Sequence, residues 1–189
     1  MKLAIHKRTT GKKGETNKLR REGNIPAILY VQNEPGTPVY VKKDEVQAIL
    51  RNMKPGLLAT TVFELNEGDK KHKAIVKDIQ YHVATYDVIH IDFALISDKQ
   101  PVTVNVPIQM TGVADCVGVK LGGFIRQVIR TLKVSCLPKD IPQEFTVDVS
   151  KLDITHSKTL ADIAIPSTVR PIAKMSEVAV IVGKKAGTA

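Results

Sequence analysis

Apolar residues recur along the first half of the chain in short runs, each bounded by turn residues. Runs of this length that are rich in Val, Ile, Phe and Tyr are typical of β-strands. The runs lie at 25–31, 38–41, 57–65, 70–83 and 88–95. The pattern predicts a sheet of several short strands.

One segment has the helical period instead. Val46, Ile49, Leu50 and Met53 recur at i, i+3, i+4 and i+7. Acidic residues stand at the start of this segment, where they suit a helix dipole, and a Pro-Gly pair follows its end. The spacing predicts a helix whose apolar stripe covers the sheet.

The runs at 70–83 and 88–95 also predict a polar surface. Successive side chains of a strand point to opposite faces, so His90 and Asp92 share one face and the apolar residues between them face the core. Gln80 and His82 lie on the corresponding face of the preceding run. With a turn centred on 85–87, we expect His82 to lie beside His90 and Gln80 beside Asp92.

The second half predicts another set of strands and no long helix. Strands are expected at 102–106, 124–136, 145–149 and 178–182. The segment 97–101, which contains Pro101, has the composition of a linker, and five further prolines punctuate the rest of this half. We therefore expect a mainly β protein with two domains, 1–96 and 97–189.

Positive charge is concentrated at the N-terminal end. Residues 1–30 contain eight basic and two acidic residues, a net charge of +6, against +9 for the whole chain. We expect a charged loop here that orders on binding, and a short helix that begins at Thr16 and ends at Gly23. The candidate binding residues in this part are Arg8, Lys12, Lys13, Asn17, Lys18, Arg20 and Arg21.

A positive cluster next to a strand indicates a polyanion ligand, and RNA is the interpretation that we favour. The chain has no Trp, four Phe and four Tyr, so backbone and groove contacts would outweigh base stacking. Lys and Arg would neutralise phosphates, and Gln80, His82, His90 and Asp92 would contact base edges and 2′-hydroxyls. The alternative is that these four are ordinary solvent-side residues.

No pattern indicates an enzyme or a bound cofactor. Cys116 and Cys136 are too far apart for a CxxC motif, so neither a zinc site nor a disulfide framework is expected. The segment 118–123 is rich in glycine but lacks the Gly-Lys-Ser/Thr ending of a phosphate loop, which favours a turn. Neither a signal peptide nor a membrane span is indicated, so we expect a cytoplasmic protein.

One catalytic alternative stays open. His82, His90 and Asp92 contain the ligand types of a two-histidine, one-carboxylate metal site, which would suit a metal-dependent hydrolase. Residues of these types on a hairpin are more often surface or hydrogen-bonded groups. A different RNA ligand, such as tRNA, is the other alternative.

Several segments together resemble a known family. The residues that carry the resemblance are Gly11-Lys-Lys-Gly14, Leu19-Arg-Arg-Glu-Gly-Asn-Ile-Pro-Ala-Ile-Leu-Tyr30, Asp78-Ile-Gln-Tyr-His82, His90-Ile-Asp-Phe93, Gly118-Val-Lys-Leu-Gly-Gly123, Cys136-Leu-Pro-Lys-Asp-Ile-Pro142 and Val147-Asp-Val-Ser150. In order and spacing they resemble the bacterial large-subunit ribosomal protein that binds 5S rRNA, in the long form also known as general stress protein Ctc. The resemblance spans nearly the whole chain.

The resemblance implies a six-stranded N-terminal β-barrel that binds the loop E region of 5S rRNA, and a second, mostly β domain. It also implies a ribosome-associated protein whose partners are 5S rRNA and neighbouring ribosomal proteins, and which is a monomer off the ribosome. The implied RNA contacts are Arg8, Lys12, Lys18, Arg20, Tyr30, Gln80, His82, His90 and Asp92. This chain has Tyr81 and Val83 where the family often has Arg and Pro, and Val31 where a Gly is usual.

Overall fold

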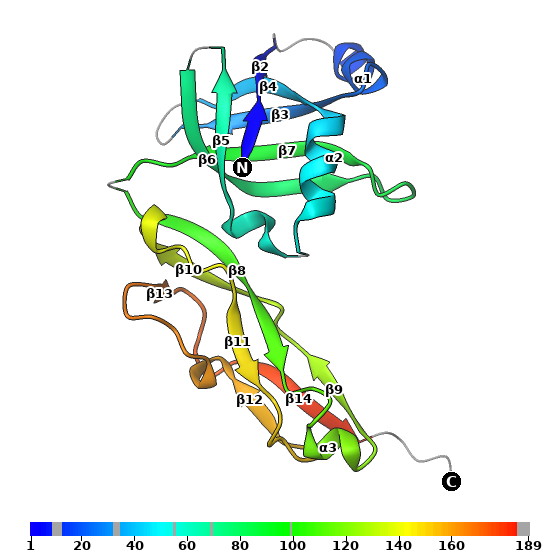
Figure 1. Cartoon of the computed structure of the whole chain (residues 1–189), viewed down its shortest axis with the longest axis vertical. Coiled ribbons are helices and arrows are strands. Elements are labelled where there is room, and N and C mark those ends of the chain that lie inside the picture. Colours follow the sequence, from blue (N-terminus) through cyan, green and yellow to red (C-terminus); the bar gives the residue numbers. More distant parts are fainter. Residues whose placement is uncertain (9–12, 32–34, 55, 69, 99, 185–189) are drawn as a thin grey trace. The chain divides into compact units, whose positions relative to one another are not determined.

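The structure, a computed structural model, describes residues 1–8, 13–31, 35–54, 56–68, 70–98 and 100–184. The chain forms two compact units, Met1–Gln100 and Pro101–Ala189, each with its own buried residues. Both units consist mainly of β-strands with a few short helices (Figure 1). The predicted fold class is therefore confirmed.

The first unit contains a seven-stranded sheet and two α-helices. Its elements are β1 (Lys2–Ala4), β2 (His6–Lys7), α1 (Lys13–Arg21), β3 (Asn24–Tyr30), β4 (Thr37–Lys42), α2 (Lys43–Asn52), the 3-10 helix η1 (Leu57–Thr60), β5 (Val62–Glu67), β6 (Lys70–Tyr81) and β7 (Val88–Leu95). The strand order is β1-β5-β6-β7-β3-β4-β2.

The two outermost strands of this sheet come from one segment of chain. β1 pairs with β5, β2 pairs with β4, and the amide of Ile5 between them donates to the carbonyl of Asn66 at 2.9 Å. Residues 2–7 therefore join both edges of the sheet and nearly close it into a barrel. Counted as one interrupted strand, this segment makes the barrel six-stranded, as predicted.

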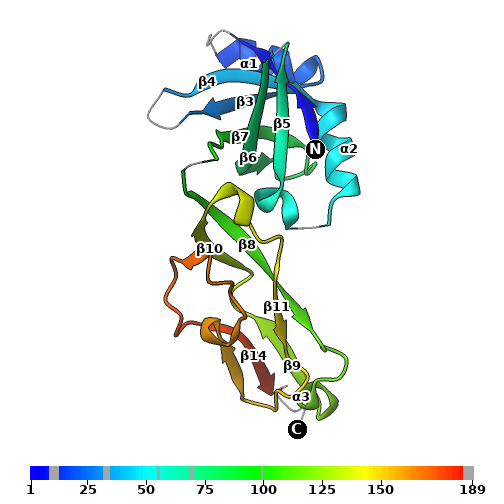
Figure 2. The ribbon, with the colours of Figure 1, turned by 60° about the vertical axis from the view of Figure 1, so that its left-hand side comes forward.

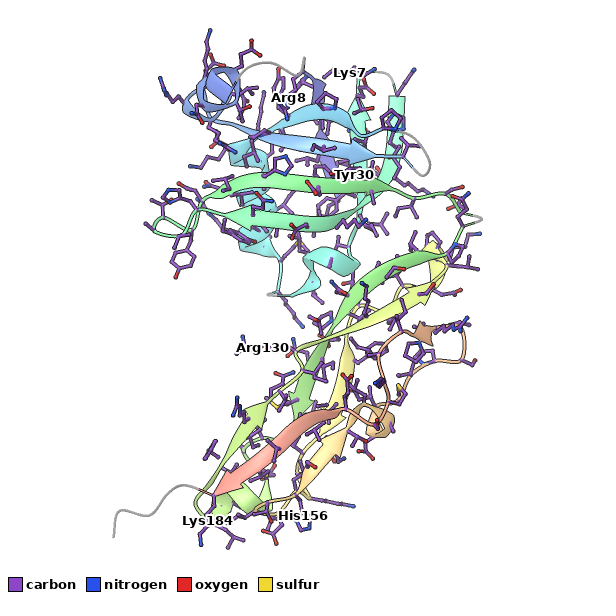
Figure 3. All side chains as sticks on the ribbon, turned by 180° about the vertical axis from the view of Figure 1, so that it is seen from behind. Lys7, Arg8, Tyr30, Arg130, His156 and Lys184 are labelled. Atoms are coloured by element: carbon purple, nitrogen blue, oxygen red, sulfur yellow. The ribbon has the colours of Figure 1, made fainter. Side chains whose placement is uncertain are left out.

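The barrel interior is apolar, and α2 packs on it. Phe63 and Phe93 meet edge to face inside, with ring centroids 6.4 Å apart. Val46 of α2 is buried, and the other apolar residues of its stripe pack against the same core. The opposite surface of β3, β7 and β6 has no helix over it, as the view from behind shows (Figure 3).

Two local predictions for the first unit were wrong, and one pair of strands was not predicted. The helix predicted to begin at Thr16 begins at Lys13, although it ends before Gly23 as expected, with Gly23 in the left-handed region at φ 77°. Leu57–Thr60 is a 3-10 turn, not the first half of a strand, and follows Gly56 at φ 90°. Residues 2–7, which were not predicted as strands, form β1 and β2.

The second unit contains two sheets. Its elements are β8 (Val102–Thr111), α3 (Val117–Lys120), β9 (Gly123–Gln127), β10 (Thr131–Cys136), the 3-10 helix η2 (Pro138–Asp140), β11 (Phe145–Asp148), β12 (Ser157–Thr159), the 3-10 helix η3 (Leu160–Asp162), β13 (Arg170–Pro171) and β14 (Val178–Lys184). One sheet has the order β11-β8-β10-β13 and the other β12-β14-β9. β8 is the long strand between β10 and β11 (Figure 2).

The single strand predicted at 124–136 is two strands in different sheets, because the chain leaves β14 after Gln127 and joins β8 from Thr131. The glycine-rich segment 118–123 includes the helical turn α3, where we had predicted only a turn. Cys116 and Cys136 are both buried and unpaired.

Candidate nucleic-acid interface

The pairing of β6, β7 and β3 aligns polar side chains in rows across the uncovered surface of the barrel. Gln80 lies opposite His90, and Asp78 lies opposite Asp92. On the other side of β7, Asp92 is level with Ile28 of β3. Ile91 and Phe93, between the polar residues, are 2% and 1% exposed, so the predicted division of β7 into a core face and a polar face is confirmed.

The predicted hairpin register was wrong. His82 does not face His90, because β6 ends at Tyr81 and the amide of His82 donates to the carbonyl of Asp87 at 2.7 Å. The turn is thus centred between Ala84 and Thr85, earlier than expected, and the register shifts between Gln80 and Tyr81. His82 belongs to the turn, at the end of the polar rows.

His90 and Asp92 contact each other on the polar face. Nδ1 of His90 lies 2.9 Å from Oδ1 of Asp92, and the two side chains are 18% and 22% exposed. Among the described residues no donor is aligned to make a hydrogen bond to this oxygen. Asp78 stands opposite Asp92 in the pairing, and two like charges directly opposite each other are unfavourable unless a donor or cation binds. The arrangement can accept hydrogen bonds from the amino groups of bases.

Tyr30 lies on the same surface (Figure 3). It is 37% exposed and follows Ile28 by two residues, so it shares that residue's face of β3. A Cβ on Gly36 would come within 3.1 Å of the Tyr30 ring and 2.7 Å of the Ile28 methyl. The glycine therefore lets the Tyr30 ring lie close to the backbone just before β4.

Hydrogen bonds from Arg20 hold the basic helix α1 beside the polar rows. Its guanidinium donates to the carbonyl of Ile89 from Nε at 3.3 Å and from Nη2 at 3.1 Å. Asn17 supports this geometry weakly, since its Oδ1 accepts from Nη1 of Arg20 at 3.5 Å. Lys18 and Arg21 are exposed, and Lys18 makes only a 4.0 Å contact with Glu22. These two cations are available to phosphates.

Arg8 directly follows β2, the strand beside β4 at one edge of the sheet order. Its amide donates to the carbonyl of Pro38 and its Nε to the carbonyl of Val39, both at 3.1 Å. Pro38 pairs with Ile28, and Ile28 pairs with Asp92. Arg8 therefore lies in the same row across the sheet as Asp92. The charged loop predicted within 7–22 is replaced from Lys13 to Arg21 by α1, and its residues 9–12, with Lys12, lie outside the described residues. Of Lys13 only the backbone is described.

Sequence reasoning missed a pair of rings beside Arg8. His6 and Tyr40 stack with centroids 5.0 Å apart and an interplanar angle of 29°, and they pair across β2 and β4. The alternation of Leu3 and Ile5 with His6 and Arg8 is a strand signal that would have found this segment.

The three residues of the metal-site alternative do not lie together, because His82 is in the turn and does not face His90 or Asp92. Within the described ranges, no group of three or more His, Cys, Asp or Glu side chains is placed to hold a metal ion. In that same part of the chain, no helix is both long and apolar enough to cross a membrane.

Comparison of the sequence with known proteins places the chain in a class of ribosomal protein. The sequence profile of the Ribosomal L25p family matches residues 3–93, and that of the ribosomal protein TL5 C-terminal domain matches residues 101–186. Curated relatives align over 98% of this chain and 100% of their own length. The chain belongs to the Ribosomal L25p family.

Relatives with full-length alignments share the name large ribosomal subunit protein bL25. The protein of Chlamydia trachomatis serovar L2 is 44% identical to this chain over 185 residues. The proteins of Chlamydia muridarum and Chlamydia pneumoniae are 43% and 40% identical over the same length. The sequence-based recognition of the long form of this family is confirmed.

Proposed function

We propose that this protein is a structural, non-catalytic component of the large ribosomal subunit that binds 5S rRNA at its loop E region. Family membership supports the ribosomal role. The observation that carries the RNA contact is the uncovered surface on which Gln80, His90 and Asp92 align beside the basic helix α1. 5S rRNA is the partner proposed for this surface.

The two parts of the surface have different tasks in this proposal. Lys18, Arg21 and Arg8 neutralise phosphates and release counterions, which supplies affinity without sequence preference. Gln80, His90 and Asp92 contact base edges and 2′-hydroxyls in the wide minor groove of the RNA helix. Asp92 accepts from an exocyclic amino group such as N2 of guanine, a donor that A·U pairs lack. Tyr30 contacts the backbone between the two parts.

The other parts of the chain have supporting roles in the proposal. Residues 1–96 form the RNA-binding domain, and residues 97–189 form a second domain that contacts the ribosome or its proteins. The protein acts as a monomer before it joins the subunit, in the cytoplasm, with neighbouring ribosomal proteins as its further partners.

The test is a titration of the full-length protein with a loop E fragment and with an unrelated RNA duplex of equal length, at several salt concentrations. We expect tighter binding to the loop E fragment and a salt slope that corresponds to about four to seven phosphate contacts. Equal affinity for both RNAs, or binding that salt does not weaken, would contradict the proposal. Competition with tRNA separates 5S rRNA binding from a more general RNA-binding role.

A further inference from the structure

A cavity of about 160 Å³ lies at the end of the polar rows, between α1, the first residue of α2 and the turn that joins β6 to β7. A single water needs only about 10–15 Å³, so a larger planar group has room here. The side chains of Arg20, Asn24, Lys43, His82, Thr85 and Asp87 line its walls. Ile89 supplies the apolar side chain of the wall, since Ile25 and Val88, which also line the cavity, are 1% and 7% exposed and belong to the buried core.

One wall of this cavity is held together by the carboxylate of Asp87. Nζ of Lys43 lies 2.9 Å from Oδ1, Gln47 donates to the same oxygen at 3.3 Å, and the Thr85 hydroxyl donates to Oδ2 at 3.3 Å. Lys43 is the main reason why the pKa of Asp87 lies below its usual range. These contacts form the wall without a ligand, and Lys43 is already paired with Asp87.

Two polar groups of the cavity are available to a ligand. The side-chain amide of Asn24 makes no hydrogen bond to the described residues, and it can both donate and accept. Nδ1 of His82 accepts from the Thr85 amide at 3.3 Å, which leaves the proton of the neutral ring on Nε2 as a donor. A ligand with both acceptors and donors on one edge suits this pair.

This chemistry favours a nucleobase over a free phosphate. A phosphate needs several unpaired donors, whereas Lys43 is neutralised by Asp87 and Arg20 donates to Ile89. An acidic side chain in the wall also repels an anion. A base instead presents an apolar face, which suits Ile89, and a polar edge, which suits Asn24 and His82.

The cavity also adjoins the proposed RNA surface. Ile89 of the cavity precedes His90 of the polar rows, and His82 follows Gln80 by two residues. Arg20 lines the cavity and holds α1 on the carbonyl of Ile89. An RNA helix that lies on the polar rows therefore has one strand next to the cavity mouth.

We propose that this cavity receives one nucleobase that swings out of the bound RNA helix. The inference rests on the proposed function and extends it: the protein would select an RNA that can extrude a base, in addition to reading the groove. Asn24 and Nε2 of His82 bind the edge of the base, and the apolar wall contacts its face.

The test uses a loop E fragment in which 2-aminopurine replaces one base at a time. This analogue is quenched when it stacks in a helix and regains fluorescence when it leaves the stack. We expect binding of the full-length protein to raise the fluorescence several-fold at one position. Asn24→Leu, which fills the cavity, and His82→Ala, which removes a donor, should abolish most of that rise and weaken binding about three- to tenfold.

His156→Ala is the matched control, since His156 is an exposed histidine of the second unit (Figure 3). It should bind and fluoresce like the unaltered protein. His82 lies in an exposed turn, so His82→Ala keeps the test valid if Asn24→Leu perturbs β3. RNA binding without a rise at any position, or a rise that both variants retain, would refute the base pocket alone. No RNA binding by the unaltered protein would refute the proposed function and the pocket with it.

Discussion

The guanidinium of Arg20 and the carbonyl of Ile89 form a two-pronged hydrogen bond that joins α1 to β7, with Nε and Nη2 at 3.3 and 3.1 Å from the oxygen. A helix of nine residues is too short to be stable alone in water. The bond holds this helix next to His90, so Arg20 positions the basic helix as well as carrying charge itself.

Arg20→Ala should therefore release α1 from the barrel, while Arg21→Ala should not. Arg21 is exposed and makes no side-chain contact within the described part of the chain. Hydrogen exchange of the α1 amides should rise strongly in Arg20→Ala and stay unchanged in Arg21→Ala. Both variants should bind RNA more weakly, because each loses one cation. Equal exchange in the two variants would show that α1 is held by other contacts.

Asp92→Asn should change the affinities for specific and unrelated RNA in opposite directions. The substitution removes a negative charge from a surface that contacts phosphates, so an unrelated duplex should bind slightly more tightly. It also weakens an acceptor for base amino groups, so the loop E fragment should bind about five- to fiftyfold more weakly. Parallel titrations measure both. Weaker binding of both RNAs would mean that Asp92 supports the fold of the face instead.

Gly118→Ala should destabilise the second unit. A Cβ at this buried position would lie 2.7 Å from a Val182 methyl and 3.0 Å from backbone atoms of Asp153 and Ile154, which cannot move independently. We expect a loss of about 1–3 kcal/mol in the free energy of unfolding, the usual cost of overpacking.

Gly14→Ala is the control for that measurement, because Gly14 lies in α1 with no atom within 4 Å of the added Cβ. It should stabilise α1 by about 0.5–1 kcal/mol, the helix preference of Ala over Gly. Urea unfolding followed separately for the two units measures both variants. An unchanged second unit in Gly118→Ala would contradict the close packing of α3.

Acid should weaken the second unit through Asp162. This carboxylate accepts from the amide of Thr159 at 2.7 Å and from its hydroxyl at 3.0 Å, and chiefly the backbone bond lowers its pKa. The stabilisation is complete above the unfolded value of about 3.9 and is lost as the pH falls through the lower folded pKa. The urea midpoint should thus fall below about pH 4. Asp162→Asn should flatten that fall and should lower the midpoint at pH 7.

The sequence predicted the positions of the strands better than the way in which the strands pair. The alternation around Ile91 and Phe93 was enough to assign the two faces of β7, because burial there follows from the period of a strand. The register of the hairpin depended on where the turn was centred. The turn residue in the left-handed region is Tyr86, with a φ of 56°, and because it is not a glycine the sequence does not reveal the position of the turn. A shift of two residues kept the same side chains on the same face but changed their neighbours, so that Gln80 lies opposite His90.

The cavity residues could not have been predicted in this way. Lys43 and Asp87 are 44 positions apart and meet at 2.9 Å only because the barrel brings the start of α2 to the β6–β7 turn. Two charged residues so far apart in the sequence produce no periodic pattern from which their contact could be predicted. The sequence therefore predicted which residues share the polar face of the barrel, but not which residues lie together at the end of that face.

The closure of the barrel by residues 2–7 has a consequence for synthesis of the protein on the ribosome. These residues pair with β4 and β5, so they have no complete set of partners until the chain has been made as far as Glu67. Leu3 and Ile5, which are 3% and 1% exposed in the folded protein, stay accessible during that time. Residues 2–4 therefore stay without their β5 partner strand until the whole of β5 has been synthesised.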